Sequence, residues 1–134
     1  MTRTLPLTAA AAVLALGAGF APFRSPSSID LARRAAAARQ SVVVVDFYTD
    51  WCGWCRVLDR AVYPDPAVAR QLDRTVFVRV DAEREGAEAA RHYRVDGFPT
   101  VLFLAADGRE IGRIRGFFPA PEFAEQARRI LESR

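Results

Sequence analysis

The pentapeptide Trp-Cys-Gly-Trp-Cys at residues 51–55 constrains this chain more than any other feature, because it separates two segments of different periodicity. Residues 42–45 are four consecutive valines, which predicts a strand buried on both faces. Residues 56–62 carry apolar side chains at helical spacing, which predicts a helix. The two cysteines therefore stand where a buried strand ends and a helix begins.

This position has chemical consequences for Cys52 and Cys55. The first turn of a helix has unpaired N–H groups and positive partial charge, which stabilise a thiolate, the reactive form of cysteine. Cys55 follows Cys52 by one helical turn, so the two sulfurs can meet. We expect Cys52 to be the nucleophile and Cys55, lying deeper, to be the resolving thiol of a redox-active pair. The alternative is an inert structural disulfide.

Two segments resemble the signatures of the thioredoxin family. Residues 46–56 resemble its active-site segment, and residues 97–100, Gly-Phe-Pro-Thr, resemble its second signature, a loop with a cis proline. Residues 62–68 are similar to one branch, the C-terminal thioredoxin-like domain of the bacterial thiol:disulfide interchange protein DsbD. The resemblance covers residues 29–134 and implies a thioredoxin fold and a thiol:disulfide oxidoreductase.

The order of elements predicts the same α/β architecture. A strand, a helix and a second strand early in the chain require parallel neighbours, and the hairpin turn at residues 106–109 adds antiparallel ones. We expect a mixed four-stranded sheet with helices on both faces. The expected helices are residues 29–40, 52–63, 66–72, 83–93 and 121–131, and the expected strands are residues 42–48, 75–80, 100–104 and 110–115.

The N-terminal residues predict export. Residues 1–21 combine one charge, at Arg3, with an apolar stretch and small residues near its end, as in a signal peptide. A signal anchor is the competing interpretation, and an internal buried helix is a third. Residues 22–28 are predicted to be a linker and residues 29–134 the thioredoxin-like domain. We therefore expect an extracytoplasmic location, periplasmic or secreted, with the domain held at the membrane if the segment remains as an anchor.

Two aspartates are candidate catalytic acids. Asp46 follows the buried valines, and burial raises the pKa of a carboxyl group, so it can accept the proton of Cys55, as the thioredoxin resemblance also implies. A structural carboxylate at the strand end is the alternative. Asp59 follows Cys52 by seven residues, on the same helix face, where the DsbD-type domain has a glutamate; a solvated surface aspartate is equally compatible. A nearby Arg79 would lower the pKa of Asp46, and the sequence does not decide whether this effect or the effect of burial is larger.

The resemblance to the thioredoxin family implies that the residues that contact partner proteins lie around the two cysteines. An apolar rim of aromatic side chains suits protein docking, although Phe117 could instead belong to the core. The cis peptide bond implied at Pro99 would present backbone that an extended substrate can pair with. The predicted partner-binding residues are Trp51, Gly53, Trp54, Phe98 and Pro99.

The composition argues against several other functions. All 19 basic residues are arginines interleaved with acids, without a basic stripe, so nucleic-acid binding is not expected. Two cysteines and the single His92 are too few ligands for structural zinc, and neither a metal nor another cofactor is predicted. His92 is expected to be exposed and without a catalytic role.

We therefore predict a monomeric oxidoreductase that exchanges its dithiol with protein disulfides or dithiols, as a reductant supplied by a membrane electron donor. The first alternative is an oxidant of secreted proteins that uses the same two cysteines in reverse. The second is a binding module in which the cysteine pair is incidental.

Overall fold

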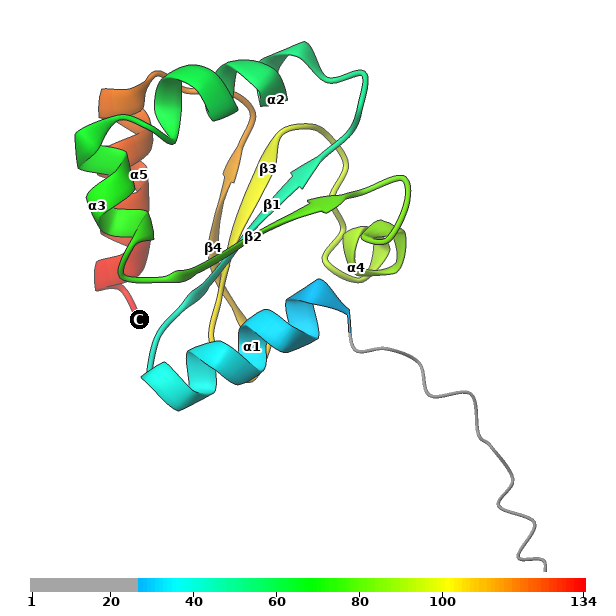
Figure 1. Ribbon diagram of the computed structural model, residues 1–134, viewed down its shortest axis with the longest axis vertical. Helices are drawn as coiled ribbons and strands as arrows, with labels where there is room; N and C mark the ends of the chain where they lie inside the picture. Colours follow the sequence, from blue (N-terminus) through cyan, green and yellow to red (C-terminus); the bar gives the residue numbers. More distant parts are fainter. Residues whose placement is uncertain (1–26) are drawn as a thin grey trace, which may run out of the picture.

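The computed structural model describes residues 27–134, whose four strands form one sheet in the order β2-β1-β3-β4 (Figure 1). β1 runs parallel to β2 and antiparallel to β3, and β3 runs antiparallel to β4, so the predicted mixed sheet is confirmed. The strands are β1 (Val43–Tyr48), β2 (Val76–Asp81), β3 (Thr100–Leu104) and β4 (Glu110–Arg115). The helices are α1 (Ser28–Arg39), α2 (Gly53–Val57), the π-helix η1 (Leu58–Val62), α3 (Pro66–Leu72), α4 (Ala87–His92) and α5 (Ala120–Glu132).

The valine run is buried on both sides because β1 lies inside the sheet. Val42 and Val44 belong to a core shared with η1, α3 and α5, whereas Val43 and Val45 belong to a second core shared with α1 and α4. Figure 1 shows the same arrangement, with α2, α3 and α5 on one side of the sheet and α1 and α4 on the other. This alternation places Asp46 on the same face of the sheet as Val44, the face covered by η1, α3 and α5.

The expected single helix over residues 52–63 changes its winding after Val57. α2 covers Gly53–Val57 and is followed by a π-helical segment, in which the Tyr63 amide donates a hydrogen bond to the Leu58 carbonyl, five residues back, at 2.9 Å. Such wide turns occur mostly inside α-helices and often near functional sites. The residues after Val57 therefore do not keep the 3.6-residue rotation from which their positions were predicted.

The helix predicted for residues 83–93 is wrong in its first half. α4 begins at Ala87, because the preceding residues form a turn around Asp81. The Asp81 carbonyl accepts the Gly86 amide at 2.8 Å, and the Glu85 carboxylate accepts the Asp81 amide at 2.9 Å. These side-chain and turn contacts compete with helix formation.

The N-terminal predictions concern residues that the structure does not describe. Residues 1–21, expected to be a signal peptide or anchor, and residues 22–26 of the expected linker lie outside the described part. Within residues 27–134, every helix is too short or too polar to traverse a lipid bilayer.

Candidate active site

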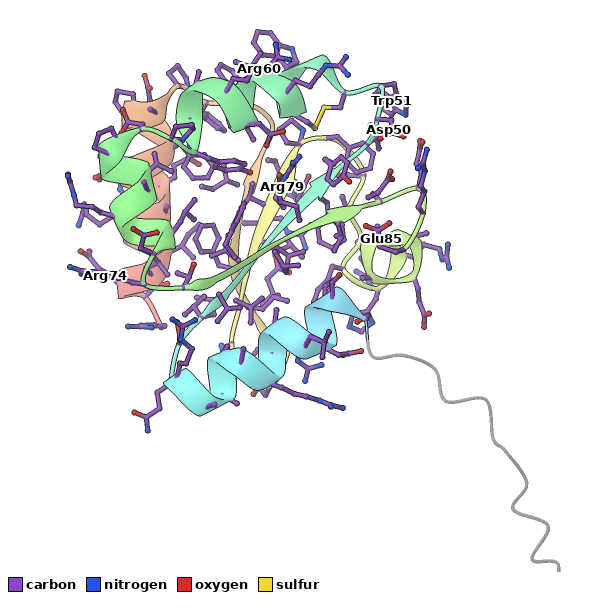
Figure 2. All side chains as sticks on the ribbon, in the orientation of Figure 1. Asp50, Trp51, Arg60, Arg74, Arg79 and Glu85 are labelled. Atoms are coloured by element: carbon purple, nitrogen blue, oxygen red, sulfur yellow. A yellow bond between two sulfur atoms is a disulfide. The ribbon has the colours of Figure 1, made fainter. Side chains whose placement is uncertain are left out.

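The two cysteines form a disulfide at the start of α2 (Figure 2). Their Cα atoms are 5.3 Å apart, and Cys52 occupies the N-cap position, where its sulfur accepts a hydrogen bond from the Cys55 amide at 3.1 Å. An N-cap is usually an oxygen-bearing side chain such as serine or aspartate. Here sulfur takes that place, so the same amide is positioned to stabilise a Cys52 thiolate once the disulfide is reduced.

Both cysteines lie just below the surface, and exposed indoles stand beside them. Cys52 is 5% exposed and Cys55 is 2% exposed, so the predicted nucleophile is the more accessible of the two. Trp51 and Trp54 are 64% and 58% exposed, which is unusual for such large apolar side chains. Figure 2 shows Trp51 at the outer edge of the molecule.

Each tryptophan contacts a second aromatic ring. Trp51 meets Phe98 edge to face with centroids 5.9 Å apart, and its indole N–H donates to the Glu83 carboxylate at 2.9 Å. Trp54 stacks on Phe117 at 4.7 Å. Phe117 therefore joins the apolar rim while its partly buried ring also packs against the core.

The remaining predicted partner-binding residues lie close by. The Phe98–Pro99 peptide bond is cis, Pro99 is buried, and its carbonyl accepts the Gly116 amide at 2.8 Å, which ties this loop to the segment that carries Phe117. Gly53 is exposed, and a Cβ atom added there would meet nothing within 4 Å. The surface around Cys52 is thus open at Gly53 and apolar on both sides.

Behind this surface, Arg79 joins two carboxylates. Its Nε donates to Asp46 Oδ2 at 2.9 Å, and its Nη2 lies 3.1 Å from Asp59 Oδ2. Asp46 and Arg79 face each other because they are register partners in the parallel pair β1–β2. The guanidinium also lies 4.4 Å from the centre of the Tyr48 ring, in a cation–π contact.

Burial decides the proton affinity of Asp46. Its side chain is fully buried, and this desolvation raises the pKa of the carboxyl above its ordinary value, although the hydrogen bond and charge of Arg79 oppose the rise. The balance that the sequence left open therefore favours a raised pKa. A carboxyl with a raised pKa is better suited to accept a proton near neutral pH.

Asp59 forms an ion pair that the sequence did not predict. The prediction placed it on the helix face of the cysteines, and in the described part of the chain its carboxylate pairs with Arg79. Through that guanidinium it is linked to Asp46. Its catalytic role stays a prediction.

Sequence reasoning missed two residues of this region, Tyr63 and Glu83. Tyr63 carries a polar group that is buried beneath the active-site helix, and Glu83 binds the indole of Trp51. The only available signal for Tyr63 was a hydroxyl on the apolar stripe of a predicted helix.

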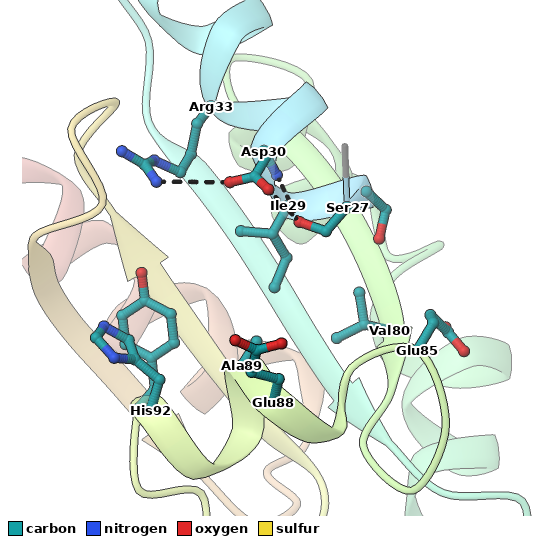
Figure 3. A pocket seen from close by; sticks show the side chains of 11 residues that line it. Ser27, Ile29, Asp30, Arg33, Val80, Glu85, Glu88, Ala89 and His92 are labelled. Atoms are coloured by element: carbon teal, nitrogen blue, oxygen red, sulfur yellow. Dashed lines mark hydrogen bonds and ion pairs between the residues drawn. The ribbon is translucent and has the colours of Figure 1, made fainter. Parts of the chain in front are cut away.

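A separate hollow of about 290 Å³ lies between α1 and α4 (Figure 3). Its polar wall includes Asp30, Arg33 and the exposed His92, and Asp30 already accepts a hydrogen bond from Ser27. Among residues 27–134, no cluster of three histidine, cysteine or acidic side chains could hold a metal ion. Nothing in this hollow adds to the chemistry of the disulfide.

Comparison with known families agrees with this geometry. Residues 29–130 match the family model described as thioredoxin-like domain. The chain belongs to the thioredoxin-like family. A solved thioredoxin from Thermus thermophilus superposes with a TM-score of 0.68 and 36% identity, over 75% of this chain and 81% of that one. The oxidised C-terminal domain of DsbD from Neisseria meningitidis superposes with a TM-score of 0.63 and 26% identity, over 74% of this chain and 89% of that one.

Curated relatives also include thiol:disulfide interchange proteins DsbD. The protein from Pseudoalteromonas atlantica is 36% identical over 102 residues, and that from Cronobacter sakazakii is 37% identical over 100 residues. These matches cover 72% and 71% of this thioredoxin-like chain but only 17% of each relative's length. The family and the Cys52–Cys55 disulfide together make this domain a thiol:disulfide oxidoreductase.

Proposed function

We propose that this protein is an extracytoplasmic reductant of protein disulfides, acting through Cys52 and Cys55. The observation that carries the proposal is a disulfide at a helix N-cap whose more accessible cysteine, Cys52, is flanked along the chain by two exposed tryptophans. Such a position stabilises a thiolate and offers an apolar surface to a protein partner. The curated relatives named for thiol:disulfide interchange support the same chemistry.

The proposed reaction starts from the reduced dithiol. The Cys52 thiolate attacks one sulfur of the partner disulfide, and the partner's other sulfur leaves as a thiolate. Cys55 then loses its proton and attacks the Cys52 sulfur, which releases the partner's second thiolate and forms the Cys52–Cys55 disulfide. Two electrons pass to the partner, so a donor dithiol must reduce the disulfide before the next cycle.

Asp46 is the proposed acceptor of the Cys55 proton. Its burial and raised pKa support this role, because burial favours the neutral, protonated form of the carboxyl group over the charged form. Asp59 is proposed to act through Arg79, whose guanidinium it shares with Asp46.

The partner is proposed to dock on the aromatic rim. Trp51 and Trp54 supply exposed apolar area, Phe98 and the cis Pro99 supply backbone for pairing with an extended segment, and Gly53 leaves room for its approach. The export pattern of residues 1–21 supports an extracytoplasmic location. A separate membrane protein is the proposed electron donor, and the domain is proposed to act as a monomer.

Reduction of insulin by the wild-type protein and by Cys52→Ser tests the proposal. We expect the wild type to accelerate reduction and the variant to lose the activity, because serine cannot form the mixed disulfide. Equal rates of insulin reduction by the wild type and the variant would refute the enzymatic role and favour the alternative of a binding module. The variant Cys55→Ala should accumulate the mixed disulfide with the physiological partner, and its identification would name the substrate.

The reduction potential tests the direction of electron flow. A value near −270 mV resembles that of thioredoxin and supports the reductant, whereas a value near −120 mV is that of a strong oxidant. The second result would replace the proposed direction while leaving the roles of the two cysteines unchanged.

A further inference from the structure

The outer face of α2 and η1 carries two arginines, Arg56 and Arg60, close to the aromatic rim. Arg56 lies in α2 and Arg60 in η1, and both side chains are exposed. Figure 2 shows Arg60 on the outer side of the helix, at the same end of the molecule as Trp51. Neither arginine forms an ion pair among residues 27–134. Two positive charges therefore face the solvent where a partner approaches Cys52.

The carboxylates nearest to these arginines in the chain bind other cations. Asp50 precedes α2, and its Oδ2 atom lies 2.7 Å from Arg84 Nη2. Asp59 lies in η1, and its Oδ2 atom lies 3.1 Å from Arg79 Nη2. The positive charge on the outer helix face is therefore not neutralised by an ion pair with its neighbours in the chain.

The guanidinium of Arg56 is held close to the segment that carries the nucleophile. Its Nη1 atom donates a hydrogen bond to the carbonyl of Asp50, two residues before Cys52, at 2.9 Å. This bond restricts the side chain in the free protein, so less conformational entropy is lost when a partner binds. A guanidinium has further N–H donors and can bind a carboxylate through two parallel hydrogen bonds. Arg56 is therefore prepared to bind a carboxylate beside the disulfide.

An acidic protein segment fits this surface better than an anionic lipid bilayer. Cys52 must touch a sulfur of its partner, so the side chains around Cys52 contact the residues around the partner's disulfide. A bilayer on the same surface would cover Cys52 and keep the partner away. Glu83, which binds the indole of Trp51, adds a negative charge on that side of the rim, so the attraction acts on the helix side.

We propose that Arg56 and Arg60 select partner proteins whose disulfide is flanked by aspartate or glutamate residues. This inference rests on the proposed function and names the class of protein disulfide that the site reduces. Arg56 binds a carboxylate next to the partner's disulfide, and Arg60 attracts a second acidic side chain of the same segment. Opposite charges at such a surface speed the encounter and disfavour partners of the wrong charge.

Two synthetic peptides, each with one intramolecular disulfide, test the proposal. They have the same length, and the residues beside the cysteines are glutamate in one peptide and glutamine in the other. The readout is the ratio of kcat/KM for the acidic peptide to kcat/KM for the neutral peptide. A change in the reactivity of Cys52 affects both peptides and cancels in this ratio, and the peptides' own reactivities cancel when protein variants are compared.

The variant Arg56→Gln/Arg60→Gln removes both charges. We expect it to lower the ratio about tenfold at low salt, and we expect the ratio of the wild type to fall in the same direction at about 1 M salt, where ions screen the attraction. Arg56→Lys/Arg60→Lys keeps both charges and should retain most of the ratio. The control Arg74→Gln removes an exposed cation that Figure 2 shows far from Trp51, and it should leave the ratio unchanged.

Four results would contradict these expectations in different ways. An unchanged ratio in the glutamine double variant would overturn the proposal. An equal fall in Arg74→Gln would overturn it as well, because the ratio would then report only the net charge of the protein. An unchanged ratio, together with binding of the wild type but not of the double variant to phosphatidylglycerol vesicles, would assign the two arginines to a membrane-binding surface instead. If the wild type reduces neither peptide faster than Cys52→Ser does, the proposed function itself fails, and this inference fails with it.

Discussion

Replacing Arg79 with methionine removes the cation that contacts the buried Asp46 carboxylate. A hydrogen bond to a charged group contributes about 1.5–3 kcal/mol, and breaking one partner of a fully buried ion pair costs about 3–5 kcal/mol. The Arg79 side chain is 34% exposed, so water can partly replace it, and the smaller range applies. We expect Arg79→Met to lower the free energy of unfolding by about 2 kcal/mol at pH 7, or the melting temperature by about 8 °C.

The loss should depend on pH in a defined direction. Burial raises the pKa of Asp46 in the folded protein above its value in the unfolded chain. The contribution of this group to the free energy of unfolding is therefore fully present below the pKa of the unfolded chain, and it is lost as the pH rises through the pKa of the folded protein. Arg79 lowers the folded pKa, and Arg79→Met therefore raises it further. The difference between wild type and variant should be largest at neutral pH and shrink in acid, where Asp46 is protonated in both proteins.

Urea unfolding of the oxidised proteins, measured at a series of pH values, tests this reasoning. The matched control is Arg128→Met on α5, which removes a cation from exposed pairs with Glu125 and Glu132. Surface pairs of this kind contribute little, so the control should change stability far less. A loss in Arg79→Met no greater than in Arg128→Met, or one that is equally large in acid, would refute the assigned contact.

Two further predictions concern exchange and partner binding. Asp46→Asn should slow insulin reduction between about pH 6 and 9, because the amide cannot accept the Cys55 proton; unchanged rates would exclude Asp46 from the mechanism. The same variant should raise the free energy of unfolding at pH 7, because it removes a buried charge while the amide carbonyl can still accept a hydrogen bond from Arg79. Trp54→Ala breaks the stack with Phe117 and should raise KM for a protein disulfide up to about tenfold, without changing the rate with a small disulfide; equal effects on both substrates would place Trp54 outside the docking surface.

Local patterns in the sequence were sufficient to predict the sheet and the cysteine pair. The valine run predicted a strand covered on both faces, and its alternating residues do divide between two cores. The change of periodicity at residue 52 predicted the strand-to-helix turn at which Cys52 caps α2. Both features depend on neighbours in the chain, so no knowledge of the tertiary structure was needed.

The carboxylate network depends on contacts that no local pattern contains. Arg79 meets Asp46 because of the register of two parallel strands that are joined only through a long crossover. Asp59 and Tyr63 follow the change to π-helical winding at Leu58, so the 3.6-residue spacing used for the prediction no longer describes their rotation about the axis. Asp59 therefore could not be placed beside Arg79 from spacing alone.

The side chain at position 79 also explains how one cation can serve two acids. Its Nε and Nη2 atoms bind Asp46 and Asp59 at the same time, while the flat guanidinium lies against the Tyr48 ring. An ammonium group has neither the fork nor the flat face, so a lysine here would lose part of this arrangement. Because Asp46 and Asp59 share one guanidinium, a change in the charge of either carboxylate alters the electrostatic environment of the other. The proton affinity of Asp46 is therefore set by the group as a whole, by burial on one side and by Arg79 with its second carboxylate on the other.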